Sequence, residues 1–390
     1  MTPHALAAFT EEAARGGNPS SLHAAGQRAR RALEDARESL AASLGAHPSE
    51  VIFTSGGTEA DNLGVKGLFW SRRDTDPRRK RILCSSIEHH AVMDTVEWLE
   101  RHEGAEAVWL PCDASGTTSV GAVRAELERD AESIALIAVM WANNEVGTLQ
   151  PVAEISALAA EYGVPMHSDA VQAFGHVPLD FASSGLATMA VSGHKVGAPV
   201  GVGALVVRRD ATITPVQHGG GQQRGLRSGT LDAAGASGFA AAATDAVGRV
   251  EQEGPRLAAL RDRLVEGVRA AVPEARLSGP SDGALRLPGI AHFTFPGCEG
   301  DSLLFLLDMM GVEASTGSAC TAGVPRPSHV LLAMGLAEEE ARGAQRFSLG
   351  WSSTDDDVDA LLAVIGRAFE QARQAGMAGH ESTIRTASVR

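Results

Sequence analysis

The sequence predicts an α/β fold: a mostly parallel, seven-stranded sheet with helices on both faces, followed by a smaller α+β domain. Three features indicate this. Seven short apolar segments alternate with helical segments, polar clusters follow the ends of several of them, and the pattern changes near residue 250. Short buried strands separated by helices form parallel sheets, whose ligands bind at the carboxyl ends of the strands.

Each element is expected from its local pattern. Alanine and leucine at helical spacing predict a helix over 21–46. Further helices are expected over 58–72, 152–162 and 256–272. A last helix is expected after Thr354, because Thr354 and Asp357 form a capping-box pattern. The strands of the large sheet are expected at 51–54, 82–84, 107–110, 134–140, 164–166, 187–191 and 204–207, and those of the second domain at 290–295 and 345–349.

Composition and charge exclude several classes of function. The net charge of −14 at pH 7 argues against direct binding to DNA or to an anionic membrane surface. No apolar run approaches the ~18 residues of a membrane span, and we expect no signal peptide. The cysteines, at positions 84, 112, 298 and 320, form no CxxC pair. We therefore expect reduced thiols in a cytoplasmic protein without a metal site.

Lys195 is one of only three lysines in the 390 residues, and its setting is unusual. It follows the apolar segment 186–191 and lies among the small residues of 192–197. A lysine at the end of a buried strand, beside a hydroxyl and an imidazole, suits an amine that forms a Schiff base with an aldehyde cofactor. The alternative is an ordinary lysine at a strand end.

Two glycine-rich segments could bind a phosphate. Residues 55–58 join an expected strand to a helix, where backbone N–H groups favour an anion. The second segment, 218–222, is followed by the Arg-Ser-Gly-Thr of 227–230. Either could be only a tight connection or a flexible loop. With Ser192 and His194 beside the candidate lysine, a bound phosphate is the better interpretation.

Polar residues that suit a cofactor ring follow other expected strands. Asp169 and Gln172 come after the strand at 164–166. A buried carboxylate needs a cationic partner, and a protonated pyridine nitrogen would be one, although a helix N-cap is the alternative for Asp169. Residues 143–145 also follow a strand end. His89, in the one adjacent histidine pair, could stack on a ring or move protons, although a lone histidine is usually structural.

Cys320 and Arg346 are the candidate reactive and substrate-binding residues of the C-terminal part. Cys320 lies within 315–327, where two glycines and two prolines indicate a loop. An exposed thiol in a cytoplasmic protein is a liability unless it reacts. Arg346 enters an apolar strand, which is costly unless it binds a carboxylate; a structural salt bridge is the alternative.

Eight short motifs occur in order along the chain. They lie at 55–62, 88–92, 143–147, 169–172, 192–195, 227–230, 317–320 and 346–350. As a set they resemble the cysteine desulfurases of the nitrogen-fixation and iron–sulfur-assembly type (NifS/IscS-like), in the class V aminotransferase group of pyridoxal-phosphate fold type I. The likeness runs from about Gly17 to Trp351 and is highly specific. The short spacing from Cys320 to Ser328 is similar to that of the subgroup whose cysteine lies on a long mobile loop.

The resemblance implies a role for each candidate residue. Pyridoxal phosphate would be bound to Lys195, with L-cysteine as the substrate and Cys320 as the nucleophile. Asn144 and Arg346 would bind the substrate carboxylate, and Asn144 would also contact the cofactor. The other implied cofactor contacts are Asp169 at the pyridine nitrogen, Gln172 at the phenolic oxygen, His89 on the ring, Gly57, Thr58, Ser192 and His194 at the phosphate, and Thr230 at the phosphate of the neighbouring subunit.

The implied reaction moves sulfur from L-cysteine to the enzyme. Lys195 or His89 would move the α-proton, and the Cys320 thiolate would attack the substrate sulfur, leaving a persulfide on the enzyme and releasing alanine. A free thiol has a pKa near about 8.5, so a base or a positive field must favour the thiolate. The implied partners are a second subunit in a homodimer and a sulfur acceptor, either an iron–sulfur scaffold or a tRNA-thiolation enzyme.

The resemblance also sets the expected domains. Residues 1–250 would form the large cofactor-binding domain, 251–376 a small domain with the Cys320 loop, and 377–390 a disordered tail. The family normally opens with a short strand and a Tyr-Leu-Asp-x-Ala-Ala-Thr-Thr-Pro segment, whereas this chain starts at residues that match those just after it. We expect a start codon assigned too late, rather than a protein that lacks part of its active-site wall.

Other interpretations stay open. A selenocysteine lyase, or another class V enzyme such as an aminotransferase or epimerase, would share the cofactor site, but a transaminase needs no loop thiol. A non-catalytic sulfur-assembly scaffold would differ from all of these, because added L-cysteine would not change the absorbance of its bound cofactor.

Overall fold

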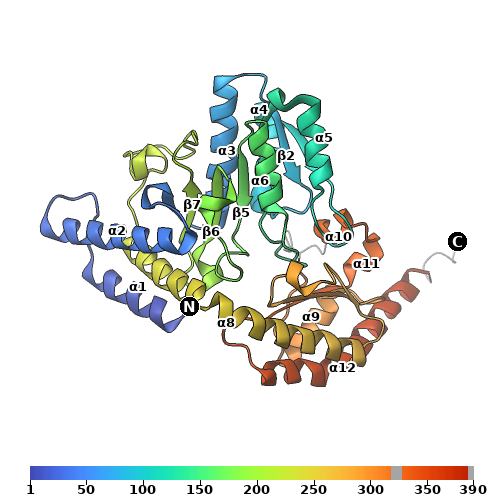
Figure 1. The fold of residues 1–390 in the computed structure, drawn as a ribbon. Helices are drawn as coiled ribbons and strands as arrows, with labels where there is room; N and C mark the ends of the chain where they lie inside the picture. Colours follow the sequence, from blue (N-terminus) through green and yellow to red (C-terminus); the bar gives the residue numbers. More distant parts are fainter. Residues whose placement is uncertain (318–326, 385–390) are drawn as a thin grey trace. The chain divides into compact units, whose positions relative to one another are not determined.

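The computed structural model of the chain describes residues 1–317 and 327–384, with side chains as far as Ala375. Two compact units form within it (Figure 1). The first comprises Met1–Pro111, Thr118–Ala142 and Gln150–Glu251, and the second comprises Cys112–Thr117, Asn143–Leu149 and the described residues from Gln252 onward. Each unit has its own sheet.

The first unit is built on a seven-stranded sheet of order β1-β7-β6-β5-β4-β2-β3. Its strands are β1 (Val51–Thr54), β2 (Arg81–Ser85), β3 (Glu106–Leu110), β4 (Ile134–Ala138), β5 (Met166–Asp169), β6 (Thr188–Ser192) and β7 (Gly203–Val207). Neighbouring strands from β6 to β3 run parallel, whereas β7 is antiparallel to both β1 and β6. The prediction of a mostly parallel sheet is confirmed.

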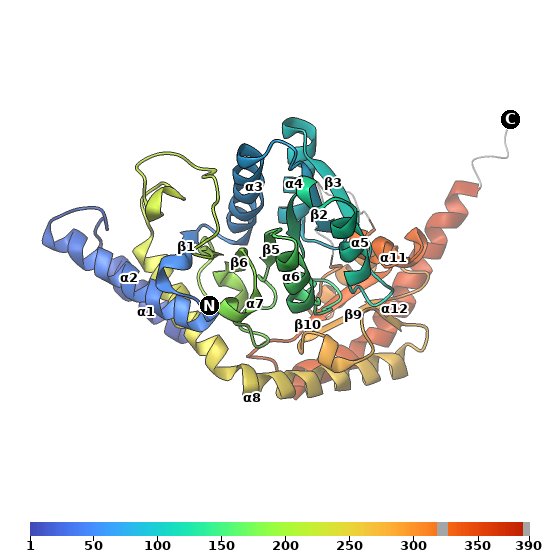
Figure 2. The ribbon, with the colours of Figure 1, turned by 45° about the horizontal axis from the view of Figure 1, so that its top comes forward.

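Helices cover both faces of this sheet (Figures 1 and 2). Alternate strand residues point to opposite faces: Val51 and Phe53 pack into one buried cluster, and Ile52 into the other. The helices of the first cluster include α2 (Ala24–Leu44), α5 (Val120–Asp130), α6 (Val152–Glu161) and α7 (Phe181–Ser184), and those of the second are α3 (Gly57–Thr75) and α4 (His90–Glu103). A further helix, α1 (Pro3–Arg15), begins after the N-cap Thr2 and contributes Ala5 to the first cluster.

The second unit packs helices on a small antiparallel sheet of order β10-β9-β8. Its strands are β8 (Arg276–Leu277), β9 (Ile290–Thr294) and β10 (Ala344–Ser348), and its helices are α9 (Gly300–Met309), α10 (His329–Ala333), α11 (Glu338–Arg342) and α12 (Asp355–Ile384). Phe293, Phe295 and Phe347 form the centre of its core. The expected cap of the last helix is present, since the Thr354 N–H donates to Asp357 Oδ2 at 2.8 Å.

Several elements begin or end a few residues away from the ranges expected from the sequence, and three of these differences are informative. β5 begins and ends later than expected, so that Asp169 is its last residue. α8 (Ala233–Ala271) begins well before residue 256 and includes Pro255, because buried residues on both sides of the proline, such as Phe239 and Leu257, fix the helix by packing. α12 continues to Ile384 and so includes part of the range 377–390 that was expected as a tail; residues 385–390 lie outside the described part.

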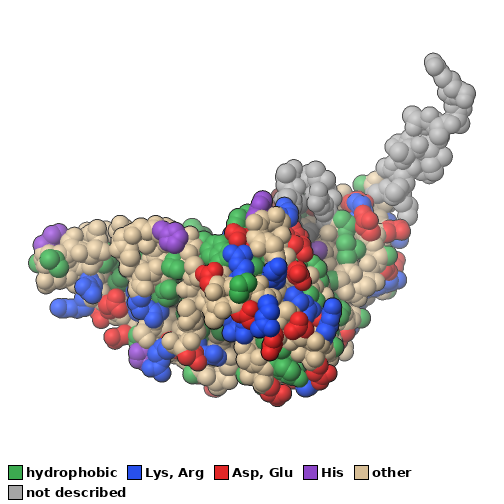
Figure 3. All heavy atoms as spheres, turned by 90° about the horizontal axis from the view of Figure 1, so that it is seen from above, with side chains coloured by type: hydrophobic (Ala, Val, Ile, Leu, Met, Phe, Trp, Pro, Cys, Tyr) green, Lys and Arg blue, Asp and Glu red, His purple; other side chains and the backbone are tan. Residues whose placement is uncertain are grey.

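The surface carries charges of both signs. Basic side chains lie beside acidic ones over much of the face seen in Figure 3. Within the described residues, every helix is too short or too polar to pass through a lipid bilayer.

Candidate active site

The carboxyl ends of β5 and β6 bring predicted site residues together. β5 ends at Asp169, and the neighbouring parallel strand β6 ends at Ser192. The next residues, Gly193–Val196, form a short 3₁₀ helix that contains Lys195. The positive charge of Lys195 is close enough to lower the pKa of the Asp169 carboxyl group. Lys195, expected to bind the cofactor aldehyde, and Asp169, expected to bind the pyridine nitrogen, are therefore neighbours.

Asp169 is a buried carboxyl group, only 5% exposed. The Val171 N–H donates to its Oδ1 at 2.8 Å, whereas no described residue donates to Oδ2. Burial raises the pKa of Asp169 to about 6, although the Val171 N–H and the Lys195 charge oppose the rise. The residues that follow, including the partly buried Gln172, form turns and not a helix, so Asp169 is not a helix N-cap. A cation at Oδ2 would stabilise the ionised carboxylate.

The N-terminus of α3 lies against the turn that follows Asp169. A Cβ on Gly57 would come within 2.7 Å of Val171 Cγ2 and 3.5 Å of Ser192 Cβ, so that glycine is required here. The preceding Gly56 has a φ of 154° and gives the helix no side-chain cap. The first N–H groups of α3 are therefore open to an anion, next to Ser192.

Ser192 and His194 are bonded to each other beside this helix terminus. Ser192 Oγ and His194 Nδ1 lie 2.9 Å apart, and Ser192 is buried whereas His194 is exposed. Partial burial and the charge of Lys195 lower the pKa of His194. Thr58 is exposed on the first turn of α3. The predicted phosphate ligands of this chain thus converge on one helix terminus.

His89 is the N-cap of α4. Its Nδ1 accepts a hydrogen bond from the Ala91 N–H at 3.1 Å, which places the ring hydrogen of the neutral form on Nε2. Desolvation lowers the pKa of His89, and the charges of His90 and Lys195 lower it further. His89 is therefore a neutral imidazole within electrostatic reach of Lys195.

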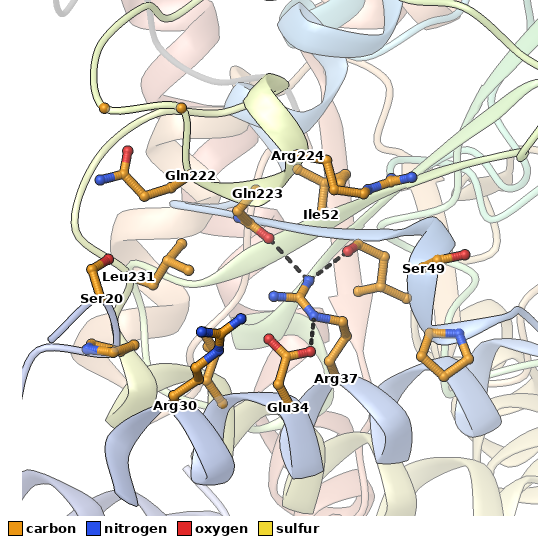
Figure 4. A pocket seen from close by; sticks show the side chains of 16 residues that line it. Ser20, Arg30, Glu34, Arg37, Ser49, Ile52, Gln222, Gln223, Arg224 and Leu231 are labelled. Atoms are coloured by element: carbon orange, nitrogen blue, oxygen red, sulfur yellow. Dashed lines mark hydrogen bonds and ion pairs between the residues drawn. The ribbon is translucent and has the colours of Figure 1, made fainter. Parts of the chain in front are cut away.

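The glycine-rich segment before Thr230 is fastened to the edge strand β1. The Gln223 side-chain amide donates to the Phe53 carbonyl and accepts from the Phe53 N–H, the latter at 3.0 Å. Arg37 NH1 donates to Gln223 Oε1 at 3.0 Å, and these residues line a cavity of about 610 Å³ (Figure 4). Gln223 and Arg224 have positive φ angles of 49° and 60°, a strained backbone that the side-chain bonds hold in place.

A second attachment joins this segment to α3. Arg227 donates to both carboxylate oxygens of Glu59, at 2.7 and 3.2 Å, in the first turn of that helix. Burial raises the pKa of Glu59, but the bonds from Arg227 and Ser55 outweigh it and lower the pKa below its ordinary value. Thr230 itself is exposed, and among the described residues it has no hydrogen bond to the turn at Gly57. The structure does not bring Thr230 to the other phosphate candidates of the same chain.

In the second unit, Arg346 and Asn144 lie together. Arg346 NH1 donates to the backbone carbonyl of Asn144 at 2.7 Å. Arg346 Nε is buried and has no acceptor among the described residues. Burial lowers the pKa of Arg346, and the charge of Glu145 opposes this. An additional carboxylate would satisfy the unpaired donor.

The remaining predicted residue, Cys320, lies outside the described residues. Cys84 is buried in the core, where burial raises the pKa of its thiol. Sequence reasoning missed the supporting residues Gln223 and Glu59. The acidic residue in the first turn of α3 was a signal for Glu59, but nothing in the sequence reveals that Gln223 bonds an edge strand. In the described part of the chain, no group of His, Cys, Asp and Glu side chains could hold a metal ion.

Comparison with known proteins gives consistent matches along almost the whole chain. The model of the aminotransferase class-V family matches residues 2–361. A relative named "IscS-like cysteine desulfurase" from Mycobacterium tuberculosis is 57% identical over 97% of this chain and 96% of its own length. The solved structure of a "NifS-like protein" has a TM-score of 0.85 and 33% identity, covering 95% of this chain and 96% of its own. Another, titled "SspA in complex with cysteine", has a TM-score of 0.75 and 33% identity, covering 90% and 95%.

Proposed function

The chain belongs to the aminotransferase class-V family and to its cysteine desulfurases, and we propose that Lys195, Asp169 and Cys320 carry out its reaction. That reaction removes sulfur from L-cysteine, with pyridoxal phosphate as cofactor and alanine as product. The observation that carries the assignment is the lysine amine within electrostatic reach of a buried carboxylate, at the ends of two adjacent parallel strands.

The residues at these strand ends fit pyridoxal phosphate. Asp169 Oδ2 has no donor among the described residues, and a protonated pyridine nitrogen would supply one with a positive charge. The uncapped first turn of α3, where a Cβ on Gly57 would collide with Val171, can receive a phosphate. The pyridine nitrogen of the cofactor would thus meet the Asp169 carboxylate, and its phosphate would meet the N–H groups of the first turn of α3.

Pyridoxal phosphate, when bound, supplies an aldehyde carbon for amines and an electron-withdrawing ring. Lys195 would hold the aldehyde, Asp169 would keep the ring nitrogen protonated, and Gln172 would bond the phenolic oxygen. The phosphate contacts would be Gly57, Thr58, Ser192 and His194. His89 would cover the ring, and its neutral imidazole is suited to hold or move a proton, as is the Lys195 amine.

Arg346 and Asn144 would bind the carboxylate of L-cysteine, for which the unpaired Arg346 Nε provides a donor. Cys320 would act as the thiolate that attacks the substrate sulfur. The carbon–sulfur bond of the substrate then breaks, Cys320 keeps the sulfur as a persulfide, and a proton delivered to the carbon completes alanine. The persulfide would pass to an iron–sulfur scaffold or to a tRNA-thiolation enzyme in the cytoplasm.

The enzyme would act as a homodimer. Thr230 is exposed and has no hydrogen bond to its own α3 turn among the described residues, yet its segment is held firmly by Arg227 and Gln223. A fixed, outward-facing hydroxyl is suited to bind the phosphate held by a second copy of the chain.

Purified protein loaded with pyridoxal phosphate tests the proposal. L-cysteine should yield alanine and, with a reductant, sulfide in equal amounts. Cys320→Ser should retain the cofactor and lose alanine release, whereas Cys112→Ser, which changes the partly exposed thiol of the second unit, should retain both. Unchanged alanine release by Cys320→Ser would exclude the persulfide route.

A further inference from the structure

A series of buried hydrogen bonds is centred on His167, two residues before Asp169 on β5. His167 Nε2 is 3.2 Å from Asp61 Oδ1, and His167 Nδ1 is 2.9 Å from Thr188 Oγ1. All three side chains are inaccessible to solvent, at 0–1% exposure. No step of the proposed reaction uses any of them.

These residues connect the three elements at the candidate cofactor site: β5 and β6, which end there, and α3, which begins there. His167 is two residues before Asp169 on β5, so both side chains lie on the same face of the sheet. Asp61 is one turn beyond Thr58 on α3, and Thr188 is the first residue of β6. The imidazole fits against α3 because residue 64 is glycine: a Cβ there would lie 2.6 Å from His167 Nδ1.

Charge in this buried region limits which of the hydrogen-bonded residues can be protonated. Burial raises the pKa of Asp61 well above its ordinary value, and the nearby carboxyl groups of Asp169 and Glu88 raise it further. Burial lowers the pKa of His167 to about 3, so the imidazole is neutral. Asp169, with the Val171 N–H and the Lys195 cation beside it, is the carboxyl group best able to carry a negative charge.

One arrangement satisfies all of these groups. A protonated Asp61 donates its O–H to His167 Nε2, and the Nδ1–H of the neutral imidazole donates to Thr188 Oγ1. The reverse arrangement, with Asp61 ionised and accepting from Nε2–H, would place a second buried negative charge near Asp169. Such a charge is costly without a cationic partner.

We propose that Asp61, His167 and Thr188 are positioning residues, an uncharged hydrogen-bonded chain that aligns α3 with β5 and leaves Asp169 as the sole anion facing the cofactor. The proposal rests on the proposed function, because it assigns these residues to pyridoxal-phosphate binding. Through them, the helix terminus that receives the phosphate and the carboxylate that receives the ring nitrogen are held at a fixed spacing.

Four variants, reloaded with pyridoxal phosphate, test this. Asp61→Leu removes the donor and Asp61→Asn keeps a donor without a titratable group. Thr188→Val removes only the acceptor and is close in shape. Ser156→Ala is the control, since it also deletes a buried hydroxyl bond, to Ser184, but on α6 in the other core cluster. The measurements are the dissociation constant of pyridoxal phosphate and the pH midpoint of the visible absorbance of the bound cofactor.

Asp61→Leu should weaken cofactor binding roughly tenfold, as expected for a lost buried hydrogen bond, and Thr188→Val should weaken it severalfold. Asp61→Asn should restore binding and leave the pH midpoint unchanged, and Ser156→Ala should match the wild type. Cofactor affinity that Thr188→Val leaves unchanged would overturn the positioning role. A midpoint moved by on the order of one unit in Asp61→Asn would mean that Asp61 is ionised.

These failures are distinct from failure of the proposed function. If the wild-type protein binds no pyridoxal phosphate at Lys195, the function is wrong and the variants have nothing to position. If the wild type binds it and releases alanine while Asp61→Leu and Thr188→Val bind it equally well, the function stands and the inference is wrong.

Discussion

At the scale of single residues, Asp169 connects pH, stability and cofactor binding. Burial raises the pKa of its carboxyl group to about 6, against an ordinary value of 3.8. Because the folded state then holds the proton more tightly than the unfolded state, stability is lost as the pH rises from about 4 through about 6. Asp169→Asn keeps the acceptor for the Val171 N–H but has no charge to bury.

We predict that Asp169→Asn stabilises the cofactor-free protein above about pH 6 by at most about 3 kcal/mol, since one pKa unit corresponds to about 1.4 kcal/mol. Denaturant unfolding of variant and wild type at about pH 4.5 and about pH 7.5 measures this. The difference should be small at the lower pH and should grow at the higher. A difference that is the same at both values would mean that Asp169 does not carry the raised pKa.

At this scale the sequence reveals residues whose chemistry is unusual for their position. Lys195 and Asp169 could be predicted because a charged group at the end of an apolar strand needs a reason to be there. His167 and Asp61 could not, because their contact depends on how α3 packs against β5, and the small residue that permits it, Gly64, is one of many glycines in the chain.

At the scale of elements, the close contact between α3 and the turn after β5 determines the shape of the candidate phosphate site. We predict that Gly57→Ala weakens pyridoxal-phosphate binding at least tenfold, because its Cβ would lie 2.7 Å from Val171 Cγ2 and would push the helix terminus away. A titration of cofactor-free protein with pyridoxal phosphate measures the dissociation constant.

Gly248→Ala is the matched control for this substitution. Gly248 lies within α8, and apart from the adjacent backbone of the helix nothing lies within 4 Å of the added Cβ, so alanine there should raise stability by roughly 0.5–1 kcal/mol and leave cofactor binding unchanged. If Gly57→Ala bound the cofactor as tightly as Gly248→Ala, the α3 terminus would not be the phosphate site.

The elements themselves were mostly predictable, and the errors have physical causes. All seven strands of the large sheet were expected, because strands buried on both faces are apolar throughout. β5 was placed too early, since its last three residues, His167 to Asp169, are polar and become buried only through the bonds and packing of the folded site. α8 was started too late because Pro255 suggests a helix boundary that packing overrides.

At the scale of the whole molecule, each cofactor site would need residues from two chains. Thr230 would contact the phosphate bound by its partner, whereas Lys195 would act within its own chain. We predict that Lys195→Ala and Thr230→Ala are each strongly impaired alone, and that mixing the two unfolded variants and refolding them together restores activity, because one site of a mixed dimer receives both native residues.

Restored activity should appear only when the chains are allowed to exchange, and sedimentation should give the mass of a dimer for each protein. Refolded mixtures of Lys195→Ala with Asp169→Ala serve as the control, since both residues belong to the same chain's site and no mixed dimer contains an intact one. Equal recovery in that control, or none with Thr230→Ala, would contradict a site shared between subunits.

Sulfur transfer to Cys320 is tested most directly by peptide mass spectrometry of the cofactor-loaded protein after brief incubation with L-cysteine. We predict one added sulfur atom on the peptide that contains Cys320, removed by reductant and absent when Lys195 is replaced by alanine. Alanine release without added sulfur on Cys320, or sulfur on that residue when Lys195 is absent, would contradict it.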